Sequence, residues 1–194
     1  MPDLIARLDK WLAANRPDYY AGLAPGISKE EVAALEAQLG VDLPPGLRDL
    51  LKWRNGQMPR NFDSIYQNFS LMDAEEIAGT RQTNNDLLAA GDFDRPDWWN
   101  PQWVPFLTNG GGDNYCVDFA GSFGGVKGQI LVWNHDYESR PIEHADFDHW
   151  LQTIVEACEQ GYLEDGDYGM EPTEEFDALY ERINPGYPKE NKAG

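Results

Sequence analysis

The chain has 194 residues, 34 of them acidic and 15 basic, so its formal net charge is −19. Such a charge disfavours nucleic acid and anionic membranes and favours cationic partners. The length is most simply one domain with a sizeable core. No apolar run approaches the roughly 20 residues of a membrane helix, the charged N-terminus does not resemble a secretory signal, and two cysteines at apolar positions suit a reducing compartment. We therefore expect a cytoplasmic protein.

The acidic residues gather in the last third of the chain. Between Arg140 and Arg182 the sequence contains many Asp and Glu residues but no Lys or Arg. Two interpretations stay open: this region steers a cationic partner toward the protein, or its charge only maintains solubility.

Helix signals fill the first half of the chain and return near its end. Apolar residues at helical spacing predict a first helix over about 3–15, and a turn-rich linker follows. Ser28 and Glu31 form a capping box ahead of an apolar stripe, and Gly40 is a natural helix end. The same signals predict helices over about 44–54 (closed by Asn55 and Gly56), 73–89, 147–160 and 173–182.

The middle of the chain carries the strand signals. Loose alternation predicts a strand within 64–72, two further strands flank Gly110 to Gly112, and another covers about 129–134. The turns between these strands are too short for parallel crossovers. We therefore predict an α+β fold with a central, largely antiparallel sheet, helices packed around it, and helical N- and C-terminal segments.

Three groups of residues, taken in order, carry a family resemblance. They are Ile27-Ser28-Lys29-Glu30-Glu31-Val32 with Leu35-Glu36, Leu39-Gly40, Leu43-Pro44-Pro45, Leu47-Arg48, Leu50-Leu51 and Asn55-Gly56; then Trp103-Val104-Pro105-Phe106-Leu107, Gly110 to Asp113 and Tyr115-Cys116-Val117-Asp118; then Gly128-Gln129-Ile130, Trp133, His135-Asp136, Phe147 and Trp150-Leu151. Together they resemble the Smi-one/Knr-four family of the SUKH superfamily.

The resemblance implies a fold and a kind of function. It implies an α+β domain that binds proteins, because the fungal namesake regulates cell-wall synthesis through protein contacts and many bacterial members are immunity proteins that neutralise toxins. It brings no shared catalytic residues. We expect a single domain over 1–183, with a family-like core at about 25–161, an acidic helical extension over 162–183, and a disordered tail over 184–194.

Residue patterns that could carry chemistry are incomplete. The glycine run lacks the Lys-Ser/Thr of a phosphate-binding loop, and a strand follows it, so a hairpin connection is favoured. Asp165 to Gly169 fails the calcium-loop pattern, and the three histidines lack metal-ligand spacing. Cys116 could pair with His135 as nucleophile and base, but its strand position argues against a reactive thiol. We expect no enzyme activity, metal or cofactor.

The residues predicted to bind a partner are loop tryptophans and acids of the extension. Tryptophan is common at interface hot spots, although the same rings could instead cap the edge of the sheet. The candidates are Trp98, Trp99, Glu164, Asp165, Asp167, Glu171, Glu174 and Glu175.

The leading interpretation is an immunity protein, monomeric or weakly dimeric, that masks a basic toxin domain stoichiometrically. A regulatory scaffold is the alternative. A ligand-binding or enzymatic role would need a pocket that gathers Cys116, Asp118 and His135.

Overall fold

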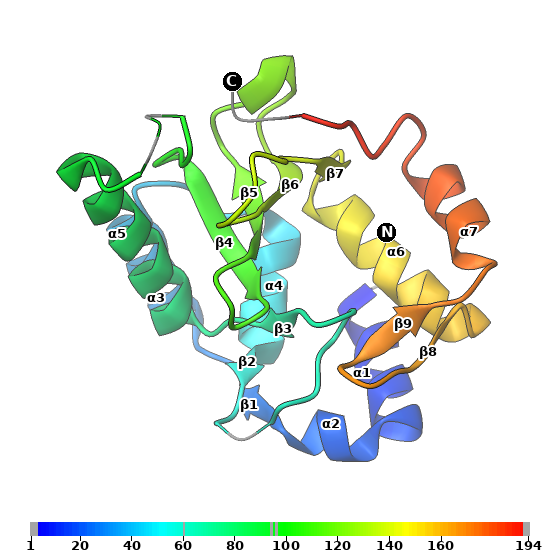
Figure 1. Ribbon diagram of the computed structural model, residues 1–194. Helices are drawn as coiled ribbons and strands as arrows, with labels where there is room; N and C mark the ends of the chain where they lie inside the picture. Colours follow the sequence, from blue (N-terminus) through cyan, green and yellow to red (C-terminus); the bar gives the residue numbers. More distant parts are fainter. Residues whose placement is uncertain (1–3, 60, 94, 96, 192–194) are drawn as a thin grey trace.

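The computed structural model describes residues 4–59, 61–93, 95 and 97–191, and it places helices on both sides of a central sheet (Figure 1). The helices are α1 (Leu4–Asn15), α2 (Pro17–Ala21), α3 (Lys29–Leu39), α4 (Pro45–Trp53), α5 (Ala74–Ala90), the 3₁₀ turn η1 (Ser122–Gly124), α6 (Phe147–Gln160) and α7 (Phe176–Ile183). The strands are β1 (Leu23–Pro25), β2 (Arg54–Gln57), β3 (Ser70–Leu71), β4 (Trp103–Thr108), β5 (Asn114–Asp118), β6 (Gln129–Trp133), β7 (Ile142–His144), β8 (Leu163–Asp165) and β9 (Met170–Pro172). This arrangement confirms the predicted α+β class.

The central sheet is an antiparallel meander. Its strand order is β3-β4-β5-β6-β7, so each strand pairs with its neighbour in sequence. Thr108 pairs with Asn114 across the triple glycine, which confirms that the glycines form a hairpin connection. β1 pairs with β2, and β8 with β9, as two separate antiparallel ribbons.

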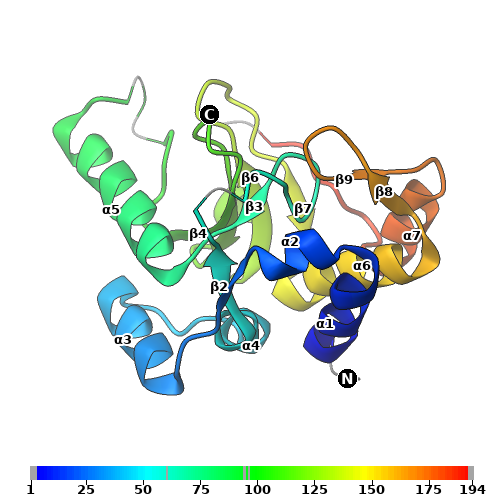
Figure 2. The same cartoon turned by 90° about the horizontal axis from the view of Figure 1, so that it is seen from below.

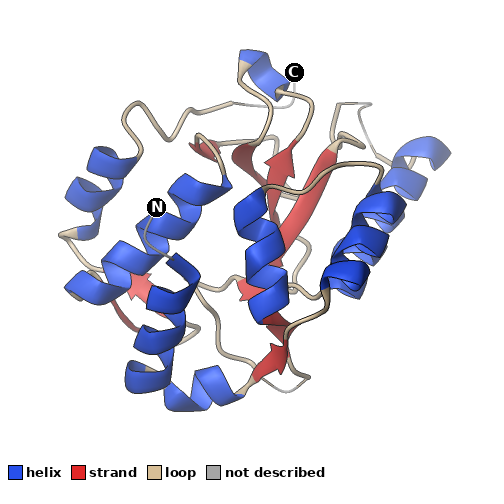
Figure 3. Ribbon diagram, turned by 180° about the vertical axis from the view of Figure 1, so that it is seen from behind, coloured by secondary structure: helices blue, strands red, loops and turns tan. Residues whose placement is uncertain are grey.

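Both faces of the sheet are covered. Helix α6 lies on one side, with α1 beside it, and α5 lies on the other (Figures 2 and 3). β4, β5 and β6 are buried along almost their whole length, as expected for a sheet between two layers. In the described part of the chain, no helix is long and apolar enough to cross a membrane.

The larger core lies between the sheet and α6. The Phe106 ring of β4 stands edge-on to Phe147 at 5.2 Å and to Trp150 at 5.0 Å. α6 presents these rings because its apolar residues recur with the helical period, and Asp146 caps its first turn by accepting from the His149 N–H.

The smaller core lies on the opposite face and is rich in tryptophan. Trp99 stands edge-on to Trp103 at 5.6 Å and to Trp133 at 5.0 Å, and Cys116 lies in the same cluster. Because Trp99 belongs to the loop after α5, this irregular loop completes the cover that α5 begins.

The capped starts of α3, α5 and α6 agree with the sequence. Helix α2 lies in the predicted linker, α7 begins at Phe176 rather than near residue 173, and the end of α4 also differs. Ser28 and Glu31 form the predicted capping box, and Gly40 adopts the left-handed conformation. α4, however, ends at Trp53, and Asn55 and Gly56 belong to strand β2. Gly56 has a positive φ, but its missing side chain serves close packing, because a Cβ would lie 2.5 Å from the backbone nitrogen of Asp73.

The C-terminal part departs further from prediction. The extension begins with the β8–β9 hairpin rather than a helix, since Leu163 and Met170 are buried while the charged residues between them face solvent. The predicted disordered tail is wrong for residues 184–191: Lys189 pairs with Ile142, and Arg140 donates to the carbonyl of Asn191. The reason is that β7 is an edge strand whose free backbone groups accept another chain segment. Residues 192–194 lie outside the described residues.

A buried histidine couples stability to pH. His144 Nδ1 lies 2.8 Å from Asn184 Oδ1, and Asn184 donates to Thr153. Burial lowers the pKa of His144 from 6.5 to about 4. The unfolded chain therefore binds the proton more readily than the folded protein. As pH falls from about 6.5 toward 4, protonation of His144 in the unfolded chain lowers the free energy of unfolding, and above pH 6.5 this effect is absent.

We expect the free energy of unfolding to drop over this interval by up to about 3 kcal/mol through His144. Urea unfolding at pH 7 and pH 4.5 measures the drop. In His144→Gln the free energy of unfolding should fall much less between the two pH values, because most of the His144 contribution is absent. An equal drop in both proteins would contradict the assignment.

Candidate functional site

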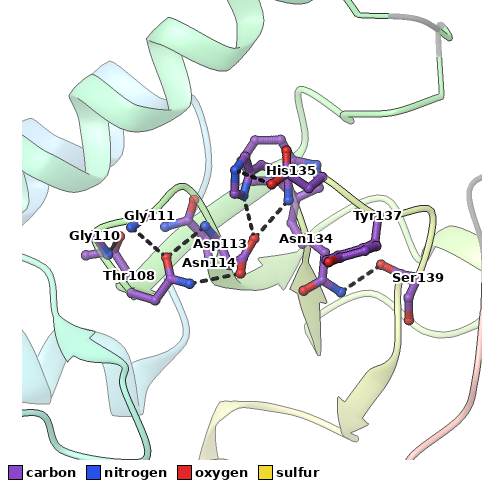
Figure 4. Close-up of polar contacts among 12 residues, drawn as sticks. Thr108, Gly110, Gly111, Asp113, Asn114, Asn134, His135, Tyr137 and Ser139 are labelled. Carbon is purple, nitrogen blue, oxygen red and sulfur yellow. Dashed lines mark hydrogen bonds and ion pairs between the residues drawn. The ribbon is translucent and has the colours of Figure 1, made fainter. Parts of the chain in front are cut away.

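The glycine turn between β4 and β5 is held by its own side chains (Figure 4). Asn109 Oδ1 accepts from the N–H groups of Gly111 and Asp113 at 2.8 and 3.0 Å, and Thr108 Oγ1 accepts from Gly110 at 3.1 Å. A phosphate cradle needs such N–H groups free to face the ligand. Here they are already used, which supports a structural turn.

The turn is fastened to the loop after β6 through His135. Asp113 Oδ1 accepts from the backbone N–H of His135 at 2.9 Å and lies 2.8 Å from its Nδ1 (Figure 4). Gly112 makes room for this ring, because a Cβ on Gly112 would lie 2.8 Å from it. The last glycine of the run is thus required by the packing of His135.

The residues considered for a catalytic pocket lie in separate environments. Cys116 is fully buried, its thiol donates to the carbonyl of Asn114 at 4.0 Å, and burial raises its pKa well above the usual value. Asp118 accepts from the backbone of the following turn and from Gln129. His135 bonds to Asp113 instead. The nucleophile, base and acid of the proposed pocket therefore do not meet.

A groove of about 640 Å³ runs between α5 and the glycine turn. Its volume is typical of ligand sites. The walls are formed by α5 and the loop after it, by the glycine turn with the adjoining ends of β4 and β5, and by the end of β6 with the loop beyond it. They comprise Glu76, Gly79, Thr80, Thr83, Asn84, Leu87, Phe93, Thr108, Gly110, Gly112, Asn114, Trp133 and His135.

The two predicted tryptophans have structural partners. Trp99 is 1% exposed and its indole N–H donates to Asn85, so its predicted role as a partner anchor is wrong for this fold. Trp98 is half-buried: its indole donates to the carbonyl of His135, and the Arg140 guanidinium lies 4.8 Å from its ring centre. Both rings cover the tryptophan-rich face of the sheet, because α5 alone is too narrow to do so.

The predicted acids lie on the C-terminal extension and face solvent. Of the six, only Glu171 is half-buried, and the others are exposed; the set is Glu164, Asp165, Asp167, Glu171, Glu174 and Glu175. Within the described ranges, no three His, Cys, Asp or Glu side chains gather closely enough to hold a metal ion. The structure brings the hairpin acids together with residues from elsewhere in the chain.

Arg16 joins the extension to the rest of the molecule. Its side chain is almost fully buried and pairs with Asp63 and with Asp165, the latter at 3.2 Å. It also donates to the carbonyl of Ser64 at 3.0 Å. One buried cation thus links the β8–β9 hairpin and the N-terminal segment to residues 63 and 64, and the two acids that pair with it lie at the surface.

Two exposed aromatic residues, absent from the sequence-based set, lie beside these acids. Phe62 is 89% exposed and Tyr168 is 70% exposed. Both line one hollow, and Phe62 also lines a second hollow that the acids border. The only sequence signal was an isolated aromatic ring in each polar loop. We call the set Asp18, Phe62, Asp63, Asp165, Asp167 and Tyr168 the acidic-aromatic surface.

The sequence matches the SMI1 / KNR4 family (SUKH-1) over residues 26–153, and the chain belongs to this family. It is 25% identical to a glucan synthesis regulatory protein of Neurospora crassa, over 93% of this chain and 42% of that protein. It is 24% identical to the cell wall biosynthesis/cell cycle regulator smi1 of Schizosaccharomyces pombe, over 80% and 35% of the two chains.

A third relative is the cell wall assembly regulator SMI1 of Saccharomyces cerevisiae, which is 18% identical over 81% of this chain and 41% of that protein. The chain therefore spans less than half the length of these curated relatives. All three are named as regulators.

The glycine turn gives a paired test of its structural role. Gly112→Ala places a Cβ at φ +118° against the His135 ring, whereas Gly110→Ala occupies open space at φ +70°. We expect Gly112→Ala to cost about 3 kcal/mol and Gly110→Ala about 1 kcal/mol. Urea unfolding of both variants measures the difference. Equal costs would contradict the packing role of Gly112.

Proposed function

We propose that this chain is a non-enzymatic protein-binding module that engages a cationic protein partner through the acidic-aromatic surface. The observation that carries the proposal is the exposure of Phe62 and Tyr168 beside carboxylates from three separate segments. Large exposed apolar rings within a polar rim are typical of protein interaction sites.

The charge of this surface supports a cationic partner. The hollow that Phe62 shares with the acids has one cation among its described lining residues, Arg16. This side chain is buried and paired with two acids, so the surface keeps an excess of negative charge. Asp18 and Asp167 have no ion pair among the described residues. A basic partner would gain long-range attraction from these acids and desolvated contact from the two rings.

Two settings would use such a surface. In the first, the partner is a basic toxin domain that the chain masks stoichiometrically in the cytoplasm, which makes it an immunity protein. In the second, the chain is a regulatory adaptor for a constitutive partner. The names of the three fungal relatives support the second setting. The high negative charge supports the first, because it suits masking of a nuclease.

Affinity capture from the native host, followed by kinetic measurement with the recovered protein, tests the proposal. We expect the association rate to fall at least about tenfold between 20 mM and 500 mM salt. Asp167→Lys should reduce that rate, and Phe62→Ser should speed dissociation. Asp42→Lys, the same charge change on the exposed α3–α4 loop, should change little.

Equal binding by all three variants, or an association rate independent of salt, would refute the docking surface. The recovered protein also separates the two settings. A partner whose toxicity disappears at a one-to-one ratio identifies an immunity protein, whereas a non-toxic partner identifies an adaptor.

A further inference from the structure

The groove beside α5 is elongated. Its helix wall extends from Glu76 to Leu87, a separation of 11 positions. At 1.5 Å per helical residue this wall is about 16 Å long. An extended peptide rises about 3.3 Å per residue, so about five residues would span the wall. The helix wall contains small residues, Gly79 and Thr80, which leave space for such a chain.

Two buried amide groups that line the groove have hydrogen-bonding atoms without partners among the described residues. Asn84 of α5 is 6% exposed and Asn114 of β5 is 1% exposed, and both line the groove. The Nδ2 of Asn84 and the Oδ1 of Asn114 have no hydrogen-bond partner in the part of the chain that the structure describes. Leaving a buried polar atom unpaired is costly, so each such atom needs an explanation. Arg54 Nε, Arg140 Nε and Trp150 Nε1 are also unpaired in the described residues, and the two amide atoms are the ones that belong to residues lining the groove.

The two unpaired atoms are complementary to a peptide main chain, but each has less than 1 Å² of exposed area, so both amides have to rotate toward the groove to bond to one. Asn114 Nδ2 donates to the carbonyl of Leu107 at 3.1 Å, so its oxygen is the remaining acceptor. Asn84 Nδ2 is a donor with no hydrogen bond to lose when it turns toward a ligand. A peptide offers one N–H for the acceptor and one C=O for the donor at every residue. Beyond Asn84, the groove ends at Leu87, Phe93 and Trp133, which suit an aliphatic side chain.

The groove is continuous with the acidic-aromatic surface. Glu76, Thr108 and Gly110 line both the groove and the hollow that contains Phe62 and Tyr168. We propose that the groove binds an extended, uncharged segment of about five residues of the same partner, with its main chain bonded to Asn84 and Asn114. This inference rests on the proposed function for the identity of the partner but uses different residues.

The experiment uses the isotope-labelled full chain and a defined probe. The probe is a pool of acetylated, amidated pentapeptides with Gly, Ser, Thr, Asn or Gln in the first four positions and Leu at the fifth. We expect millimolar pool to shift the side-chain amide signals of Asn84 and Asn114 and the backbone signals of the glycine turn. Asn84→Leu should weaken binding at least about tenfold. The same variant should keep or raise the melting temperature.

Control variants and probes make the outcome decisive. Gln82→Leu, on the same helix but outside the groove lining, should bind the pool normally. The proposal is overturned if the pool causes no shift or if Asn84→Leu binds it unchanged. Maltose serves as a neutral sugar probe, and the proposal is also overturned if maltose shifts these signals and the peptides do not. Groove shifts that follow protein concentration alone would indicate a second copy of the chain and overturn it as well.

The groove and the acidic-aromatic surface can fail independently. Pool binding should be insensitive to salt and to Asp167→Lys, because it depends on neutral hydrogen bonds. If the pool binds but binding of the cationic partner is unchanged by Asp167→Lys and by salt, the proposed function fails and the groove remains a peptide site. If the pool does not bind while the partner remains sensitive to Asp167→Lys, only the groove inference fails.

Discussion

The central sheet must be covered on both faces, and much of the molecule follows from that requirement. Strands β4 to β6 are buried along almost their whole length and most of their side chains are apolar, so neither side of the sheet can face water. On one side the regular helix α6 supplies the cover. On the other, α5 reaches only part of the face, and the loop after it supplies two tryptophan rings. Arg140 then fixes this loop by donating to the carbonyl of Trp98. The irregular loop after α5 therefore completes the cover of one face of the sheet, as the regular helix α6 covers the other.

The features that the sequence predicts correctly are those set by residues close together in the chain. The capping box at Ser28, the left-handed Gly40 and the helical period of α6 are set within a few residues, and the structure has all of them. The ribbons β1–β2 and β8–β9 were missed, because their pairing joins short segments whose own patterns are weak. Gly56 was misassigned for a related reason: its need for glycine arises from the neighbouring backbone at Asp73, 17 positions away in sequence.

The candidate site was only partly accessible to sequence reasoning. The absence of basic residues around the acids of the extension suggests that they face solvent, and five of the six are exposed, but only Asp165 and Asp167 belong to the acidic-aromatic surface. Burial cannot be read from residue type alone, which is why the sequence predicts an interface role for Trp99 although this residue belongs to a core. Phe62 was missed for the opposite reason: a single ring in a polar loop has no period, and only its position beside Asp165 gives it meaning. The unpaired amides of Asn84 and Asn114 also become visible only in three dimensions.

Arg16 connects two regions that lie outside the family match. Arg16 precedes residue 26 and Asp165 follows residue 153, while Asp63 lies inside the match. The acidic-aromatic surface therefore forms where the segment matched by the family model meets the residues before and after it, whereas the groove is built from the matched segment alone. Relatives that differ in the segments before residue 26 and after residue 153 would keep the groove but would have different residues at the acidic-aromatic surface. Evolution could thus replace the partner by altering the ends of the chain, leaving the sheet and its packing unchanged.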